Sequence, residues 1–355
     1  MNSRLKKCLE SKAVLTLLAI VIAFFVGAIV LFAAGVNPIL AYTTLLKNIF
    51  GNLKYMAWSV VYATPLIFTG LSVAFSFRTG VFNIGAEGQF VVGTLAAACV
   101  GILLDLPTVI HIPLCILAAI VAGAIWGIIV GYLRVKWGIN EVLSMIMFNW
   151  IAYYLSNYMV NLTILHKEGG GEATKDILTS ARIIFPKSVT SFLCPKSNAG
   201  ILLAILAVIA IYLIINKTTL GYKLKAVGFN KNAAEYAGIN VNRAVLTAMA
   251  ISGGLAGVAG AVQLMGNSFR ISQFAGQEGY GFQGITVALI GASNPIGVFF
   301  AGLFYGAMKY GSMKLSTIDA PAEIVNIIMG TIVFFIAISH VFRFVSKRKN
   351  RKGGN

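Results

Sequence analysis

Charged residues are scarce in this chain of 355 residues. Asp, Glu, Lys and Arg together make up 11% of it, whereas soluble globular domains carry about 25% charged residues. Hydrophobic residues make up 58% of the chain. A soluble fold cannot hide so large an apolar surface, so the composition predicts a protein that is partly covered by lipid.

The chain also lacks the motifs by which many enzymes hold phosphate or metal. No GxxxxGK[ST] loop is present to cradle the phosphates of ATP, and neither HExxH nor GxSxG occurs. The three histidines are far apart and do not have the spacing of metal ligands: His111, His166 and His340. We therefore expect no catalysis, no cofactor and no metal in this chain.

Long apolar stretches are what the chain does have, and they predict an all-α bundle of about ten membrane spans. The clearest stretch runs from Ala13 to Ala34 without a charge, and about 20 apolar residues are enough to cross the hydrocarbon of a bilayer. Residues 282–292 are too short to span the bilayer alone, so the sequence leaves open whether this segment spans the membrane or is re-entrant. The expected spans are 13–34, 57–77, 81–104, 109–133, 140–163, 200–216, 244–265, 282–292, 296–313 and 321–343.

The distribution of positive charge indicates the orientation. The net charge of +17 could suggest a nucleic-acid partner, but in a membrane protein the position of Lys and Arg matters more than their sum. With the N-terminus inside, most Lys and Arg fall in cytoplasmic segments, as expected for membrane proteins. We therefore expect no nucleic-acid partner, and both termini in the cytoplasm. The chain is expected to divide into a cytoplasmic N-terminal segment 1–12, a single membrane domain 13–343 and a basic cytoplasmic tail 344–355. The membrane domain includes an outer loop 164–199 and a cytoplasmic loop 217–243.

A polar, glycine-rich segment precedes the third span. Its sequence, RTGVFNIGAEGQ from Arg78 to Gln89, brings Asn83, Glu87 and Gln89 to membrane depth, where unpaired polar groups cost several kcal/mol. Together with the glycines, these residues predict a broken or re-entrant start of the helix that lines a wet cavity. The alternative for Glu87 is structural, since a carboxylate can complement the positive end of a helix and pair with Arg78.

The fifth span contributes a second polar face. Asn140 and Glu141 stand at its start, and Ser144 and Asn149 follow along it. This face could line a pathway for a polar solute, or Glu141 could sit at the cytoplasmic rim and favour the start of the helix. The candidate pathway or gating residues are Asn83, Glu87, Gln89 and Asn149.

A short helix is expected within the cytoplasmic loop 217–243. Asn230 is a good N-cap residue, Lys231–Ala237 has helical composition, and Gly238 suits the position after the helix. A helix of about two turns with small residues on one face suits docking into a groove of another protein. The alternative is an ordinary solvated connector.

Two of these segments carry a family resemblance. The stretch GVFNIGAEGQ, Gly80–Gln89, resembles the start of the third span in permease subunits of bacterial ABC importers for branched-chain amino acids, ribose-type sugars and nucleosides. The segment GYKLKAVGFNKNAAEYAGINVNR, Gly221–Arg243, resembles the coupling segment of that group. The form FNIGAEGQ looks most like the nucleoside and simple-sugar branch. The resemblance implies a type II ABC importer-like permease in the bacterial plasma membrane.

The resemblance also implies partners. They are a second permease subunit that is either a copy or a homologue, cytoplasmic ATPase subunits, and an extracellular substrate-binding lipoprotein. The ATPase would dock on the coupling segment, for which the expected contact residues are Ala233, Ala234, Tyr236, Gly238 and Ile239. A simple-sugar importer remains an alternative to a nucleoside importer. An ion-coupled secondary transporter is a further rival, but it would need intramembrane charged relays, and only Glu87 is clearly inside a span.

Overall fold

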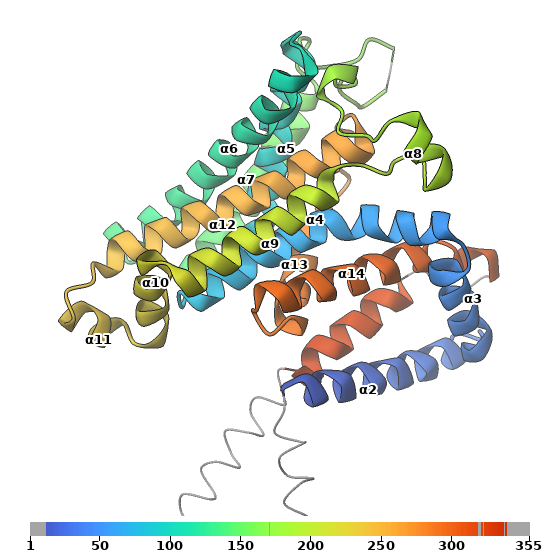
Figure 1. The fold of residues 1–355 in the computed structure, drawn as a ribbon, viewed down its shortest axis with the longest axis horizontal. Helices are drawn as coiled ribbons and strands as arrows, with labels where there is room; N and C mark the ends of the chain where they lie inside the picture. The colour runs from blue at the N-terminus through green and yellow to red at the C-terminus, as the bar shows by residue number, and fades with distance from the viewer. Residues whose placement is uncertain (1–11, 170, 319–320, 322, 337, 339–355) are drawn as a thin grey trace, which may run out of the picture. The chain divides into compact units, whose positions relative to one another are not determined.

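The computed structural model describes residues 12–169, 171–318, 321, 323–336 and 338. These residues form helices and connecting loops (Figure 1). Among them, β-pairing is limited to isolated bridges such as His166 with Thr174 and Ile184 with Asn198. The expected all-α class is therefore confirmed. The tail 344–355 and all but the last residue of the segment 1–12 lie outside the described residues.

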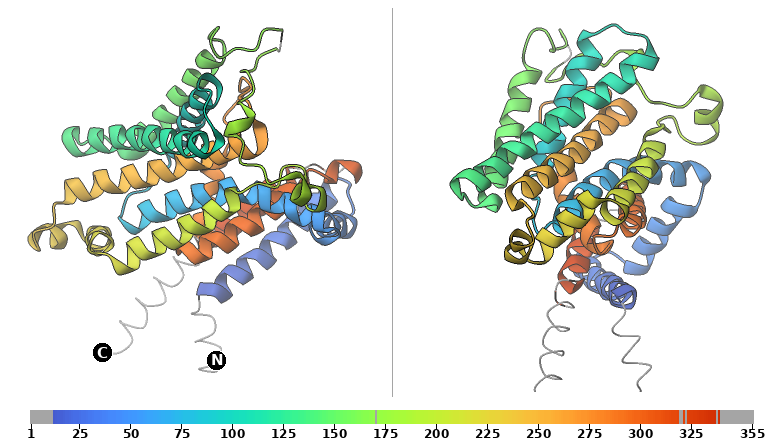
Figure 2. Two further views of the ribbon diagram at one scale, coloured as in Figure 1. Left: turned by 45° about the horizontal axis from the view of Figure 1, so that its top comes forward. Right: turned by 60° about the vertical axis from the view of Figure 1, so that its left-hand side comes forward.

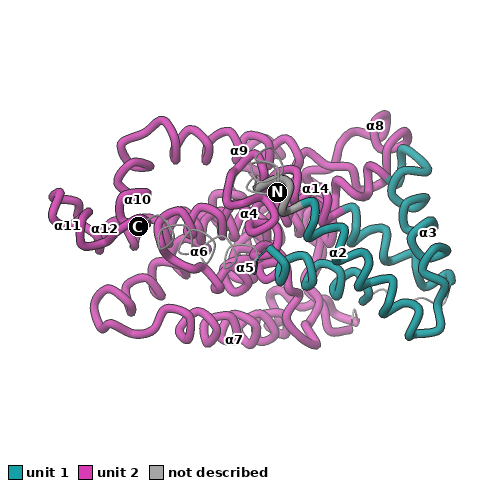
Figure 3. Tube along the Cα trace, turned by 90° about the horizontal axis from the view of Figure 1, so that it is seen from below, with its two compact units in different colours: residues 1–55, 307–355 teal, residues 56–306 magenta. Residues whose placement is uncertain are grey.

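The chain divides into two compact units (Figure 3). Unit 1 combines the two ends of the chain, Met1–Tyr55 and Ala307–Asn355, and unit 2 is the continuous stretch Met56–Gly306. The helices α4 (Leu53–Arg78) and α14 (Pro295–Ser312) each run across a boundary.

Unit 1 contains α2 (Lys12–Ala33), α3 (Pro38–Phe50), the 3-10 turn η3 (Leu315–Ile318) and a helix at Ile324–Ile336. The helix α3 begins sharply because the Asn37 side chain accepts hydrogen bonds from the N–H groups of Ile39 and Leu40, and proline occupies its first position. The sequence analysis placed no helix there. With 13 residues, α3 is too short to span a bilayer, so a search for spans misses it.

Unit 2 holds most of the long apolar helices. Among the described residues, five helices are long and apolar enough to cross a membrane: Leu53–Arg78 (α4), Ala86–Leu103 (α5), Thr108–Trp137 (α6), Gly200–Lys217 (α9) and Val241–Ser268. The last combines α12 (Val241–Gln263) with a π-helical turn η2 (Leu264–Ser268). These five coincide with the spans expected at 57–77, 81–104, 109–133, 200–216 and 244–265. The total of ten spans and the orientation stay predictions.

The remaining helices of unit 2 are shorter or more polar. They are α7 (Glu141–Val160), the 3-10 turn η1 (Thr179–Ala181), α8 (Lys187–Phe192), α10 (Thr219–Phe229), α11 (Lys231–Tyr236) and α13 (Tyr280–Ile290). The 11 residues of α13 agree with the expectation that this segment cannot cross a bilayer alone. Within unit 2, α10 and α11 lie at one end and α8 lies at the other (Figures 1 and 2).

Glycines on α5, α6 and α12 let these three helices pack backbone to backbone. A Cβ atom at Gly93 of α5 would collide with the backbone of Gly257 on α12, and a Cβ at Gly123 of α6 would collide with the carbonyl oxygen of Gly253. Small residues are the usual means of close helix approach in lipid. The glycines at this contact therefore serve the close packing of α5, α6 and α12.

The first prediction concerns this contact. Replacing Gly257 by leucine should lower the free energy of unfolding by about 1–3 kcal/mol, because the added side chain forces α12 away from α5 and α6. Thermal unfolding of the detergent-solubilised protein measures the effect. The control is Gly276→Leu, because a Cβ at Gly276 meets nothing within 4 Å. Equal melting temperatures for the two variants would contradict the tight packing.

Candidate functional site

The short helix α11 forms as the sequence predicts. The Asn230 side chain accepts a hydrogen bond of 3.1 Å from the N–H of Ala233, and Gly238 follows the helix with a φ of +79°. The N–H of Ile239 returns to the carbonyl oxygen of Ala234 at 3.0 Å, which completes a glycine-terminated C-cap. The helix ends at Tyr236, one residue before the expected end.

The five expected docking residues differ in exposure. Ala233, Tyr236 and Gly238 are exposed and Ile239 is half-buried, but Ala234 is only 3% exposed. Ala234 therefore packs against its own chain and does not offer its side chain to a partner. The Tyr236 side chain is 97% exposed, and that of Phe229 at the end of α10 is 89% exposed. Among the described large hydrophobic side chains these two are the most exposed. Phe229 was not among the expected docking residues.

Backbone contact connects α10 to the turn after α4. A Cβ at Gly228 would collide with the carbonyl oxygen of Arg78, and the Cα of Gly228 lies 3.1 Å from where a Cβ would stand on Gly80. Gly80 has a φ of +70°, which glycine adopts without steric cost. The segment that carries α11 therefore touches the first residues of the polar segment 78–89 directly.

The polar segment breaks the helical path, as the sequence analysis expects. The helix α4 ends at Arg78 and α5 begins at Ala86. The span expected from residue 81 therefore begins five residues later, because 81–85 form a non-helical connection. The Arg78 Nε donates a hydrogen bond of 3.0 Å to the carbonyl oxygen of Ser293.

Asn83 and Gln89 meet at the centre of a buried polar cluster. The Asn83 Nδ2 donates to the Gln89 Oε1 at 2.8 Å and to the Ser252 Oγ of α12 at 2.6 Å. The Ser252 Oγ donates to the carbonyl oxygen of Ser72 on α4 at 2.8 Å. All four side chains are 0–1% exposed. Three helices and the 81–85 connection are thus tied together by polar groups that satisfy one another.

Asn149 of α7 extends the connections of the same segment. Its Oδ1 accepts a hydrogen bond of 2.8 Å from the N–H of Gly88, and its Nδ2 donates to the carbonyl oxygen of Ile84 at 3.1 Å. A side-chain amide that both accepts and donates in this way replaces backbone partners where the helix is interrupted. Asn149 therefore fixes the start of α5 and is itself 2% exposed.

Glu87 holds the N-terminus of α13. Its Oε1 accepts a hydrogen bond of 2.7 Å from the N–H of Gly279, and its Oε2 accepts one of 2.6 Å from the N–H of Gly281. A carboxylate at the positive end of a helix is favourable, and charge-assisted bonds are stronger than neutral ones. The part of the structural alternative that places Glu87 at the positive end of a helix thus describes its position, and the helix is α13. Its pairing with Arg78 stays a prediction.

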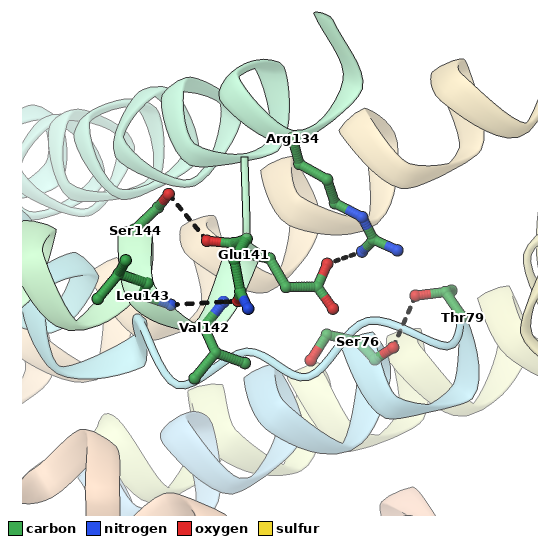
Figure 4. Close-up of polar contacts among 8 residues, drawn as sticks. Ser76, Thr79, Arg134, Glu141, Val142, Leu143 and Ser144 are labelled. Atoms are coloured by element: carbon green, nitrogen blue, oxygen red, sulfur yellow. Dashed lines mark hydrogen bonds and ion pairs between the residues drawn. The ribbon is translucent and has the colours of Figure 1, made fainter. Parts of the chain in front are cut away.

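An ion pair joins α6 and α7 at the end near α11. The Arg134 guanidinium pairs with the Glu141 carboxylate, and the two side chains point toward one another (Figure 4). Asn140 caps α7 by accepting from the N–H of Val142 at 2.9 Å. Burial lowers the pKa of Lys231 at the start of α11, and the positive charge of Arg134 lowers that pKa further. Glu141 therefore lies at the rim of the bundle, which agrees with the interpretation that it favours the start of the helix.

Comparison with known proteins identifies the family. The family model described as "Branched-chain amino acid transport system / permease component" matches residues 55–337. The chain belongs to this permease family. It is a multi-pass membrane component of an ABC transporter and not the ATPase, which agrees with the missing phosphate-binding loop.

Three relatives that align with most of the permease are all named as ABC transporter permease proteins. It is 38% identical to the "Guanosine ABC transporter permease protein NupP" of Bacillus subtilis, over 97% of this chain and 99% of the relative. It is 35% identical to the "Nucleoside ABC transporter permease protein NupB" of Lactococcus lactis, over 96% and 93% of the two chains. It is 33% identical to the "Glucose ABC transporter permease protein TsgB13" of Haloferax volcanii, over 93% and 87%.

The four candidate pathway residues of the permease share one neighbourhood. Asn83 and Gln89 bond to each other, Asn149 bonds to the backbone beside them, and Glu87 reaches from the same helix turn to α13. Their side chains are buried in this conformation, and each one bonds to another side chain or to a backbone group. Sequence reasoning missed Ser72 and Ser252, although a serine within an otherwise apolar span was a signal for a buried hydrogen bond.

The second prediction concerns Glu87. In a Glu87→Gln variant one side-chain oxygen can accept from one N–H of α13, but the amide NH₂ faces the other N–H group. We expect unfolding to become easier by about 1.5–3 kcal/mol, the usual worth of hydrogen bonds to a charged group. Thermal unfolding in detergent is the measurement, and Glu168→Gln at an exposed position of the loop 164–199 is the control. A Glu87→Gln protein as stable as the control would refute the capping role.

Proposed function

We propose that the chain is a permease subunit of an ATP-driven importer that moves nucleosides across the bacterial plasma membrane. The observation that carries the proposal is the similarity to NupP and NupB along nearly the whole length of all three chains. A simple-sugar importer is the second candidate, since the relative named for glucose is almost as similar. The proposal includes a cytoplasmic location of both termini and of the loop 217–243.

We also propose that the end formed by α10 and α11 docks the ATPase. A helix with a complete N-cap and C-cap keeps its shape without a partner, so it can transmit a push. The exposed rings of Phe229 and Tyr236 are suitable anchors, because aromatic residues are enriched among the residues that dominate binding energy. Of the expected docking residues, Ala233, Tyr236, Gly238 and Ile239 remain candidates for direct contact, and Ala234 acts by supporting the helix from beneath.

The remaining partners follow from the permease role. A single chain of this family forms part of a pore, so a second permease subunit, either a copy or a homologue, completes it. An extracellular lipoprotein delivers the solute. Asn83, Glu87, Gln89 and Asn149 act as gating residues in this proposal, because a rearrangement of α5 against α13 or α12 must exchange their hydrogen bonds.

The third prediction tests the solute and the energy source. Cells that co-express the permease with its cognate subunits should take up tritiated guanosine, and excess inosine should compete while excess glucose should not. Uptake should stop on ATP depletion and survive a protonophore that leaves ATP intact. Uptake of labelled glucose in place of guanosine would favour the sugar importer. Uptake that survives ATP depletion and collapses with the proton gradient would overturn ATP coupling.

The fourth prediction tests docking. A double variant Phe229→Ala and Tyr236→Ala should reduce co-purification of the ATPase at least about tenfold, the expected consequence of losing an aromatic anchor pair. Thermal stability should not change, because both side chains are exposed. The control is Phe192→Ala, which removes an exposed aromatic side chain from α8 at the opposite end of unit 2. Unchanged ATPase association in the double variant would exclude this surface as the docking site.

A further inference from the structure

An apolar groove lies between α6 and α9, at the end of unit 2 opposite α11. Its volume is about 800 Å³. One wall is formed by Ile112, Ile116 and Ile120 of α6, the other by Leu202 and Leu203 of α9, and Arg182 of the outer loop lies at its border. The three isoleucines recur every four residues and therefore share one face of the helix.

The groove covers about half the thickness of a bilayer. It extends along α6 from Thr108 to Ile120, or about 18 Å at 1.5 Å per residue, whereas a hydrocarbon core is about 30 Å thick. A partner helix that spans the membrane would lie along the full length of α6 and would not stop at Ile120. An acyl chain of a lipid in one leaflet fits a groove of this length.

The positive charge of Arg182 lies beside this groove. Its guanidinium carbon lies 4.6 Å above the centre of the Phe269 ring, and one terminal nitrogen donates to the carbonyl oxygen of Ile177 at 3.4 Å. Its Nε is buried and has no hydrogen-bond partner among the described residues. No carboxylate of the described part of the chain forms an ion pair with it.

A second cation lies at the same ring. The Lys196 Nζ is 5.4 Å from the centre of the Phe269 ring and donates to the carbonyl oxygen of Asn267 at 2.6 Å. Phe269 itself has a φ of +62°, a conformation that a bulky residue adopts only where its surroundings hold it. Two cations, Arg182 and Lys196, thus lie against the same ring.

We propose that this groove is a binding site for an anionic phospholipid. An acyl chain lies between α6 and α9, and the phosphate group accepts hydrogen bonds from Arg182, whose fork of donors suits a phosphate. Lys196 adds positive charge beside it. The site is independent of the solute and of the ATPase, so it stands or falls separately from the proposed transport function.

Photo-crosslinking in nanodiscs tests the site. The intact transporter is placed in phosphatidylcholine that contains a small fraction of phosphatidylglycerol with a photoreactive acyl chain. The labelled peptides should come from 108–120 and 199–203. Arg182→Gln should lower this labelling about tenfold, the consequence of losing a charge-assisted phosphate contact. The matched control Arg270→Gln removes an exposed arginine that does not border the groove and should leave labelling unchanged.

A second pair of variants keeps the test decisive if Arg182→Gln does not fold. Leu203→Trp fills the groove and should abolish labelling there, whereas Leu206→Trp adds the same bulk to an exposed position on α9 outside it and should not. Equal labelling by a phosphatidylcholine probe, labelling that ignores both groove variants, or disulfide crosslinking of a Leu203→Cys variant to a second permease subunit would overturn the proposal.

Discussion

Polar groups inside the apolar bundle must find their partners within the protein, and this constraint explains the centre of unit 2. Hydrocarbon offers no hydrogen bonds, so every donor or acceptor left unpaired there costs several kcal/mol. The break between α4 and α5 frees backbone groups at this depth. Asn149 accepts from Gly88 and donates to Ile84, and Asn83 is held by Gln89 and Ser252. The interruption exists because these amide side chains replace the missing helical bonds.

The same constraint means that the hydrogen bonds of this cluster must be exchanged for others when it rearranges. The Glu87 carboxylate can leave the N–H groups of Gly279 and Gly281 only if other donors, such as water or a polar solute, replace them at once. Packed interfaces of this kind change between discrete states. In the proposed gating role, the cluster excludes water in the conformation described here, and water or solute must replace these hydrogen bonds when they break.

If α11 docks the ATPase as proposed, the contact between Gly228 and the turn at Gly80 is the route by which a push at α11 would reach this cluster. No flexible side chain lies between the two backbones, since a Cβ on Gly228 would already collide with Arg78. A displacement of α10 therefore moves the 78–80 turn directly, and three residues later the chain reaches Asn83. The connection is direct backbone contact between the two segments.

Local signals in the sequence were enough to predict α11 and the break before α5. Asn230 and Gly238 mark the ends of a helix by capping chemistry alone, and the glycines around Asn83 indicate an interruption. Contacts between distant residues were beyond such signals. The bond from Glu87 to Gly279 joins residues 192 positions apart, and the burial of Ala234 depends on what packs beneath α11. The helix α3 was missed because its 13 residues fall below the length of a span.

Exposure divides the long helices of unit 2 into two kinds. About 83% of the most apolar window of α4 is buried within the protein, but only 33% of that of α6 and 28% of that of α9. The helices α4 and α12 therefore carry the polar cluster because they are surrounded by protein, whereas α6 and α9 present isoleucine and leucine outward. A buried helix tolerates serine and glycine because neighbouring helices provide hydrogen-bond partners and close packing. A helix that faces lipid must be apolar on its exposed face. This difference in burial explains why the hydrogen-bonded serines Ser72 and Ser252 lie on buried helices. It also explains why the exposed face of α9, as far as the structure describes it, carries no such pair.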